Sequence, residues 1–234
     1  MRVAALVPAY QAESHLGGVL ARLQALAAPP DVMVVDDGSL DGTSRVASGY
    51  GARVERFPVN RGKGHALLAG FAALRDDYDA VVTLDADGQH PPENFPDFVA
   101  AAGLGADLVL GARERTPDMP PSRRFANAFS SGWSTWLAGQ RVSDSQCGYR
   151  LYRREVLQRT PLTAGRYEFE TEIVVRAARL GFRLGEVGIP TVYGDEKSQI
   201  HAFRDVPRIF GVMVRLTIEG AFPPRAMRLA AARP

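Results

Sequence analysis

The sequence predicts an α/β protein in which helices flank a mostly parallel central sheet. Short apolar runs alternate with amphipathic segments over residues 1–112, which is the pattern of repeated strand–helix units. A polar motif follows each of these runs, at the sheet edge where α/β proteins bind ligands. The chain has 234 residues, of which 46% are hydrophobic, and this is enough for one substantial core. We therefore expect residues 1–234 to form a single domain.

The elements of the first part follow from the spacing of apolar residues. Leu16, Val19, Leu20 and Leu23 lie three, four and seven positions apart, which places them on one helical face. Similar patterns predict three further helices at Asp41–Ser48, His65–Leu74 and Phe95–Ala102. The predicted strands are Val3–Val7, Val32–Val35, Arg53–Phe57, Ala80–Leu84 and Leu108–Leu110.

After Arg113 the pattern loosens, and prolines mark a loop. The spacing predicts helices at Phe125–Leu137 and Glu170–Leu180, with a strand at Gln146–Tyr152 between them. No repeat or low-complexity linker separates this part from the first. We therefore interpret residues 113–234 as an elaboration of the same domain. Within it, Val206–Ile218 is apolar but interrupted by arginine, a composition that suits a helix lying in a membrane interface or covering the core.

Cysteine usage and hydropathy indicate the cellular compartment of the protein. The single cysteine, Cys147, cannot form an internal disulfide, and no Cys/His cluster suggests zinc. The N-terminus has too short an apolar run for a signal peptide, and no stretch approaches the roughly 20 apolar residues that cross a bilayer. These features predict a cytoplasmic protein that does not span a membrane.

The charge distribution is asymmetric. Residues 1–112 carry 8 basic and 14 acidic residues, and residues 113–234 carry 20 basic and 12 acidic ones, which gives net charges of −6 and +8. The basic residues are scattered arginines without interleaved aromatics. This favours a phosphate-bearing small substrate or a membrane surface over nucleic acid.

Asp85 and Asp87 form a DxD pattern at the end of the fourth predicted strand. Both carboxylates can turn toward one divalent cation, and oxygen ligands suit Mg²⁺ or Mn²⁺. Such an ion would screen charge on a departing nucleotide diphosphate. The competing interpretation is a turn in which an aspartate caps the next segment. An EF-hand is excluded, because glycine stands at the fourth position of the motif instead of the sixth.

Two other motifs suggest nucleotide binding. Asp36 and Asp37 follow the second strand, where a carboxylate can accept hydrogen bonds from a base or a ribose, whereas Asp41 suits helix capping. Lys63 lies between glycines just before a predicted helix, a favourable place for a phosphate, with a solvated surface position as the alternative. The motif is not a Walker A loop, because Phe57 stands at the position of its first glycine.

Together these motifs identify a family resemblance. In order, the chain contains VPAYQAE, VVDDGSLDGT, NRGKGHAL, TLDADGQH, LGARE, DSQCGYRLYRR and YEFETE. This series resembles family 2 glycosyltransferases, in particular the branch that transfers sugars to dolichyl and polyprenyl phosphates. The resemblance covers Val3 to about Arg208. It implies a glycosyltransferase A-type, Rossmann-like fold and inverting transfer from a UDP- or GDP-linked sugar, with residues 1–112 binding the nucleotide sugar and residues 113–234 forming the acceptor side.

The resemblance also implies roles for individual residues. The metal-site positions are Asp85, Asp87 and Gln89. The donor-binding positions are Pro8, Tyr10, Glu13, Asp36, Asp37, Lys63, Asp85, Arg113 and Arg124. The opening motif departs from the family pattern at Gln11, where asparagine is usual. A rearranged nucleotide edge is therefore expected there.

The need for a base depends on the acceptor. A hydroxyl acceptor needs a group that takes its proton, whereas a phosphate acceptor arrives already ionised. Asp144, Glu170 and Glu172 are the candidate carboxylates, and Glu170 and Glu172 should face nearly opposite ways on a helix. The family pattern favours Glu172, and helix-dipole stabilisation is the structural alternative for both glutamates.

The preferred acceptor is a polyprenyl phosphate, reached by peripheral contact with the inner face of the membrane. Transfer to a soluble or glycan hydroxyl is one alternative. A non-catalytic nucleotide-sugar sensor is another. A haloacid-dehalogenase-type phosphohydrolase is a third, because Asp85–Gly88 matches its DxDG motif, although that motif normally ends the first strand.

Overall fold

The computed structural model describes residues 1–113, 121–162, 168–190 and 202–221, with side chains described outside 121–126, 202–209 and 220–221. One seven-stranded sheet forms the centre, in the order β3-β2-β1-β4-β6-β5-β7. All neighbouring pairs are parallel except those of β6, which runs antiparallel between β4 and β5. The strands are β1 Val3–Ala9, β2 Asp31–Asp36, β3 Arg53–Arg56, β4 Ala80–Thr83, β5 Leu108–Arg113, β6 Arg150–Arg153 and β7 Leu184–Ile189.

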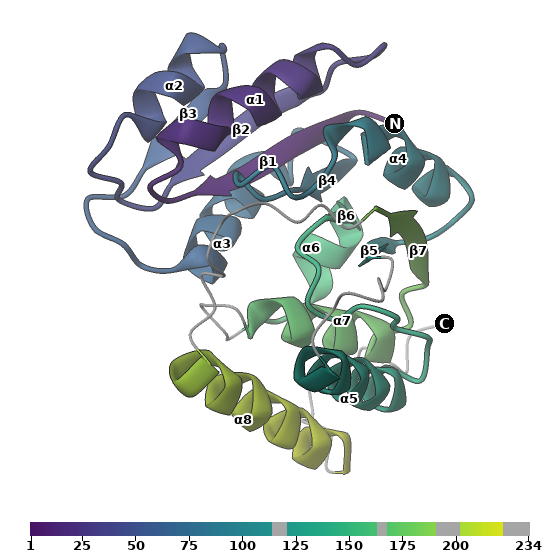
Figure 1. The fold of residues 1–234 in the computed structure, drawn as a ribbon. Helices are drawn as coiled ribbons and strands as arrows, with labels where there is room; N and C mark the ends of the chain where they lie inside the picture. Colours follow the sequence, from purple (N-terminus) through teal and green to yellow (C-terminus); the bar gives the residue numbers. More distant parts are fainter. Residues whose placement is uncertain (114–120, 163–167, 191–201, 222–234) are drawn as a thin grey trace.

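Helices cover both faces of this sheet (Figure 1). Buried side chains of α1, α2 and α4 pack on one face, and those of α3, α6 and α7 pack on the other. A further layer, formed by α5 and α8, lies against α7. The helices are α1 Glu13–Gln24, α2 Thr43–Gly49, α3 Lys63–Leu74, α4 Phe95–Gly103, α5 Pro121–Ala138, α6 Arg154–Arg159, α7 Phe169–Arg179 and α8 Ala202–Ala221, with a 3-10 turn, η1, at Pro92–Asn94.

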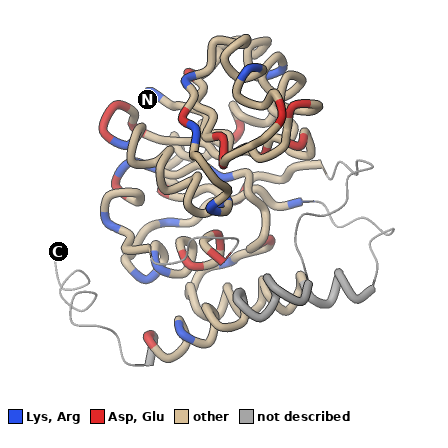
Figure 2. The backbone as a smooth tube through the Cα atoms, turned by 90° about the vertical axis from the view of Figure 1, so that its left-hand side faces the viewer, with Lys and Arg blue, Asp and Glu red and all other residues tan. Residues whose placement is uncertain are grey.

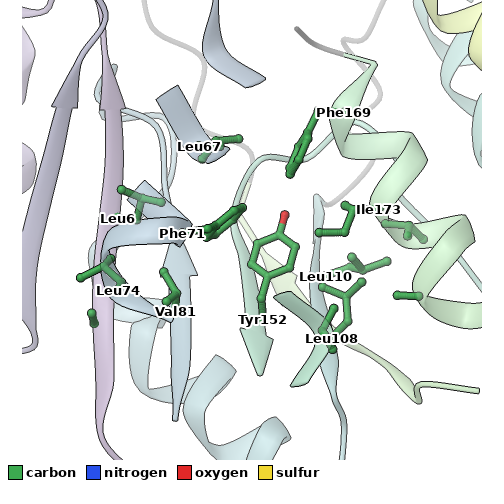
Figure 3. Packing of buried hydrophobic residues seen from close by; sticks show 14 of the residues in the cluster. Leu6, Leu67, Phe71, Leu74, Val81, Leu108, Leu110, Tyr152, Phe169 and Ile173 are labelled. Carbon is green, nitrogen blue, oxygen red and sulfur yellow. The ribbon is translucent and has the colours of Figure 1, made fainter. Parts of the chain in front are cut away.

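The core on the α3 and α7 face of the sheet joins the two parts of the chain. The ring of Phe71 in α3 packs against those of Tyr152 in β6 and Phe169 in α7, with ring centroids 5.0 and 6.1 Å apart. Figure 3 shows these rings meeting between Leu6 of β1 and Ile173 of α7. Burial of these side chains therefore ties the first turn of α7 to the sheet.

The predicted α/β fold and mostly parallel sheet are confirmed. All five strands predicted in the first part are present, and the spacing in α1 buries Leu16, Val19, Leu20 and Leu23 as expected. The expected strand at Gln146–Tyr152 is shorter and begins only at Arg150. Side chains bind the preceding carbonyls: Thr83 Oγ1 donates to the Gly148 carbonyl at 2.7 Å, and Arg150 Nε donates to the Cys147 carbonyl at 2.7 Å. The sequence pattern did not predict strand β7 or helix α6.

Candidate active site

Because β1, β2, β4 and β5 are parallel, the motifs that follow them meet at one sheet edge. The antiparallel strand β6 begins at the same edge, so the loop before it enters the site from the other direction. Helix α3 begins there at Lys63. The structure thus brings motifs from both parts of the chain to one place.

The loop after β4 is held by hydrogen bonds of its own. The Asp85 N–H donates to His90 Nδ1 at 3.0 Å, and the Gln89 N–H donates to Asp87 Oδ1 at 2.9 Å. Gly88 turns the chain with a φ of 77°, a conformation that favours glycine. Burial lowers the pKa of His90, so the neutral ring accepts at Nδ1. His90 therefore shapes the loop that carries both aspartates.

Lys63 forms the centre of a largely buried ionic triad. Its Nζ lies 2.6 Å from Asp85 Oδ1 and 2.8 Å from Glu170 Oε1. Burial disfavours the ammonium, but Asp85 and Glu170 raise the pKa of Lys63 above its usual range. Burial also opposes ionisation of Asp85, yet Lys63 outweighs it and lowers the pKa of Asp85 to about 2. Lys63 is therefore bound to carboxylates beneath the site and does not project as a solvated cation.

Gly148 lies against this triad, and although it belongs to the DSQCGYRLYRR motif it was not among the predicted site residues. A Cβ at this position would lie 2.6 Å from Lys63 Nζ, 3.0 Å from Glu170 Oε1 and 3.1 Å from Asp85 Oδ2. Only a residue without a side chain leaves room for the three charged groups. Glycine is required here for close approach.

Asp87 has a different environment from Asp85. Burial raises the pKa of Asp87, and the neighbouring Asp85 raises it further. In the part of the chain that the structure describes, no Lys or Arg nitrogen lies within 4.0 Å of this carboxylate. An added cation would relieve the repulsion between the two aspartates, so the pair fits a divalent metal ion electrostatically.

The described residues contain no cluster of three His, Cys, Asp or Glu side chains that could hold a metal alone. Two carboxylates nevertheless match the usual mode of Mg²⁺, which keeps water ligands and shares substrate phosphates. Asp85 and Asp87 are thus the residues that could hold Mg²⁺ or Mn²⁺. Gln89 contributes its N–H to the loop and is half-buried beside them.

The aspartates after β2 have partners within the protein. Asp36 is fully buried, and its oxygens accept hydrogen bonds from the Ser39 N–H at 2.8 Å and from the Ser44 hydroxyl. Asp37 accepts hydrogen bonds from the N–H groups of Arg61 and Gly62, both at 2.7 Å. Asp37 therefore positions the loop that leads into Lys63, in addition to its predicted role toward the nucleotide.

The β1 edge is organised in a similar way. Pro8 is buried within β1, and Tyr10 follows it with 38% of its surface exposed. Glu13 accepts hydrogen bonds from the Gly42 N–H at 2.8 Å and from Arg45 at 2.6 Å. Asp41 accepts the Thr43 N–H at 3.0 Å, but the N-cap residue of α2 is Gly42, and no side chain caps this helix as the sequence had suggested for Asp41.

The remaining candidates divide between the site and its surroundings. Arg113, at the end of β5, forms a two-point ion pair with Asp144. Glu172 is fully buried on another face of α7, where it pairs with Arg176 at 3.0 Å and Arg215 at 2.7 Å. The structure thus brings Glu170, but not Glu172, to the Lys63–Asp85 pair. The side chain of Arg124, in α5, lies outside the described residues.

Arg150 is a residue that the motif analysis missed. Its guanidinium is fully buried and donates to the carbonyls of Cys147 at 2.7 Å, Ser145 at 2.8 Å and Glu170. It therefore joins the loop before β6 to the first turn of α7. Arg150 belongs to the DSQCGYRLYRR motif, but the sequence does not show that its guanidinium is buried.

Comparison with known proteins identifies the family. The profile described as Glycosyl transferase family 2 matches residues 4–160. The undecaprenyl-phosphate mannosyltransferase of Micrococcus luteus is 36% identical over 206 residues, covering 82% of this chain and 84% of the relative. The polyprenol monophosphomannose synthase of Mycolicibacterium smegmatis is 34% identical over 202 residues, covering 80% of this chain and 76% of the relative.

Solved structures support the fold. Glucosyl-3-phosphoglycerate synthase from Mycobacterium tuberculosis, in complex with Mn²⁺, UDP-glucose and phosphoglyceric acid, superposes with a TM-score of 0.74 at 22% identity. The superposition covers 95% of this chain and 80% of the synthase. Together with the family match, the relatives do not favour the phosphohydrolase, sensor or hydroxyl-acceptor alternatives.

Proposed function

Because this chain belongs to glycosyl transferase family 2, we propose that it transfers a sugar, with inversion, from a nucleoside-diphosphate donor to a polyprenyl phosphate. The relatives named for undecaprenyl and polyprenol phosphates support this acceptor. The donor lies at the carboxyl edge of the sheet, against Pro8, Tyr10 and the loops organised by Asp36 and Asp37.

The chain's carboxylates have separate tasks in this proposal. Asp85 and Asp87 would hold Mg²⁺ or Mn²⁺, which would supply positive charge for the departing nucleoside diphosphate. Lys63 keeps Asp85 ionised and directed at the site, because its Nζ lies 2.6 Å from Asp85 Oδ1. Arg113 supplies positive charge on the other side of the site, for a phosphate oxygen.

The observation that carries the choice of acceptor is that every candidate base is already ion-paired. Glu170 lies 2.8 Å from Lys63, Glu172 lies 2.7 Å from Arg215, and Asp144 lies 2.6 Å from Arg113. A carboxylate held by a cation is a weak proton acceptor. A phosphate acceptor needs none, because it is already ionised. This arrangement favours a phosphate over a hydroxyl nucleophile.

A matched pair of acceptors tests the proposal. A thermal-shift screen with UDP and GDP, each with and without Mn²⁺, first identifies the nucleotide that raises the melting temperature most. The corresponding labelled sugar donor is then offered to a polyprenyl phosphate and to the free polyprenol of the same length. We expect product only with the phosphate. Equal transfer to the alcohol would contradict a phosphate nucleophile, and nucleotide binding without transfer or donor hydrolysis would favour the sensor.

A surface on α5 and α8 is suited to reach a lipid acceptor. This surface, the aromatic face, consists of Phe129, Trp133, Trp136, Phe210 and Ile218. Four of these side chains are more than half exposed, and the ring of Trp133 contacts those of Phe129 and Phe210 at 5.5 Å each. Phe129, Trp133 and Trp136 share one side of α5 by their spacing of four and three.

Charge is nearly absent from this face. Residues 127–138 of α5 contain no Lys, Arg, Asp or Glu, and the described part of α8 is largely uncharged in Figure 2. Among residues 210–219 of α8, whose side chains are described, the charged residues are Arg215 and Glu219, which pair with Glu172 and Arg176 of α7. Exposed tryptophan and phenylalanine without charge suit the headgroup boundary of a bilayer. No helix among the described residues is long and apolar enough to span a membrane.

We expect Trp136→Ser/Phe210→Ser to weaken vesicle binding by at least about tenfold, because each exposed aromatic side chain loses apolar burial in the lipid. Flotation with anionic vesicles at low and high salt measures vesicle binding, and the wild type should bind more weakly at high salt because residues 113–234 carry a net charge of +8. Leu104→Ser, at a residue 85% exposed beyond α4, is the matched control. If the wild type stays unbound at low salt, or if Leu104→Ser has the same effect, the membrane assignment to this face is wrong.

A further inference from the structure

The ion pair between Arg113 and Asp144 has the geometry of a prepared binding group. Arg113 Nε lies 2.6 Å from Asp144 Oδ2, and Arg113 Nη2 lies 3.1 Å from Asp144 Oδ1. Two parallel hydrogen bonds fix both the position and the plane of a guanidinium. Within the described residues, the remaining Nη1 makes no hydrogen bond to the protein. That nitrogen is available to a ligand.

Asp144 is itself held in place. The Gln146 N–H donates to Asp144 Oδ1 at 3.0 Å, so both carboxylate oxygens are occupied. The loop that follows is braced by the Ser130–Ser145 hydroxyl contact of 2.9 Å and by Gln146 Nε2, which donates to Thr171 Oγ1 at 3.2 Å. Helices α5 and α7 therefore fix the carboxylate that fixes Arg113.

This arrangement argues against Asp144 as a base. Burial alone would raise the pKa of Asp144, but the hydrogen bonds and charge of Arg113 lower it overall. Both oxygens already accept hydrogen bonds, and at neutral pH the group remains an ion. The Asp144 carboxylate is therefore suited to hold a cation.

Arg113 also lies within electrostatic range of the metal-binding loop. The loop that holds its partner Asp144 continues to Cys147, whose Sγ lies 3.8 Å from Nε2 of His90 in the loop after β4. An arginine that is rigid and close to this loop can meet a phosphate oxygen without first losing side-chain entropy. Arg113 is thus a cation held in a fixed position at the carboxyl end of β5.

We propose that Asp144 is a positioning residue, which holds the Arg113 guanidinium ready to bind a phosphate oxygen of the donor diphosphate or of the lipid phosphate. This inference rests on the proposed function for the identity of the ligands. Its claim about Asp144 concerns binding, and nucleotide titration tests that claim even where no transfer is observed.

The experiment compares Asp144→Asn, Arg113→Ala and the double variant. Calorimetry with UDP or GDP and Mn²⁺ measures binding of the donor phosphates, and KM for the polyprenyl phosphate measures binding of the acceptor phosphate. We expect Asp144→Asn to weaken one of these two binding affinities by about tenfold while kcat changes much less. The double variant should be no worse than Arg113→Ala, because Asp144 acts only through that side chain.

Two further variants separate positioning from stability. Arg113→Lys keeps the charge but cannot form the two-point pair, so adding Asp144→Asn to it should change binding little. Asp79→Asn removes a similar ion pair, with Arg154 at 3.1 Å, from the opposite edge of the sheet and should leave both affinities unchanged. Effects of Asp144→Asn and Arg113→Ala that multiply in the double variant would overturn the proposal. A large fall in kcat for Asp144→Asn at unchanged KM would instead make Asp144 a base.

Discussion

Asp87→Asn is expected to lower the rate of sugar transfer by at least about a hundredfold, because it removes the carboxylate that is free to bind the metal ion. The substitution preserves shape, and asparagine Oδ1 can still accept the Gln89 N–H that Asp87 Oδ1 accepts at 2.9 Å. Initial rates of transfer measured across a range of Mn²⁺ concentrations give the effect.

The melting temperature of this variant, with and without Mn²⁺, distinguishes loss of metal binding from loss of the fold. Burial and the neighbouring Asp85 both raise the pKa of Asp87, so its charge is unfavourable without metal. Asp87→Asn should therefore melt at the same temperature as the wild type or slightly higher in metal-free buffer, and should lose the Mn²⁺-dependent increase. The exposed Asp76→Asn should keep that increase. Equal activity of Asp87→Asn and wild type at limiting Mn²⁺ would contradict the metal assignment.

Lys63→Met is expected to reduce both activity and stability, because it leaves Asp85 and Glu170 facing each other without their shared cation. Breaking a buried pair by removing one partner typically costs about 3–5 kcal/mol. Methionine keeps the apolar stem of the lysine, so the loss of stability measures the contribution of the charge. Chemical denaturation measures the free energy of unfolding. Calorimetry should show a larger loss of affinity for the nucleoside diphosphate than for the nucleoside.

A second substitution separates the two effects of Lys63. Adding Glu170→Gln to Lys63→Met removes one unpaired carboxylate and should recover part of the stability, but not the binding of the diphosphate. Arg61→Met, at an exposed cation two residues earlier, is the matched control and should keep the stability of the wild type. Equal losses of affinity for nucleoside and nucleotide in Lys63→Met would separate Lys63 from the phosphates.

The sequence by itself determined the order of strands and helices in the first part and the edge at which the motifs gather. Hydrophobic periodicity reports neighbours along the chain, so it identified the buried face of α1 and the strand that ends before Asp85. Parallel strands then bring successive motifs to one edge without further information. The Asp85–Asp87 pair could be predicted for the same reason, because both residues belong to one loop.

Only the tertiary structure decided which charged groups meet. Lys63, Asp85 and Glu170 come from α3, the loop after β4 and α7, and Gly148 reaches them because β6 inserts antiparallel between β4 and β5. Helical spacing predicted that Glu170 and Glu172 face apart, but only the packing of α8 turned Glu172 toward Arg215. Ion pairs between distant segments depend on how helices pack on the sheet, and periodicity along one segment contains no information about the partner across the interface.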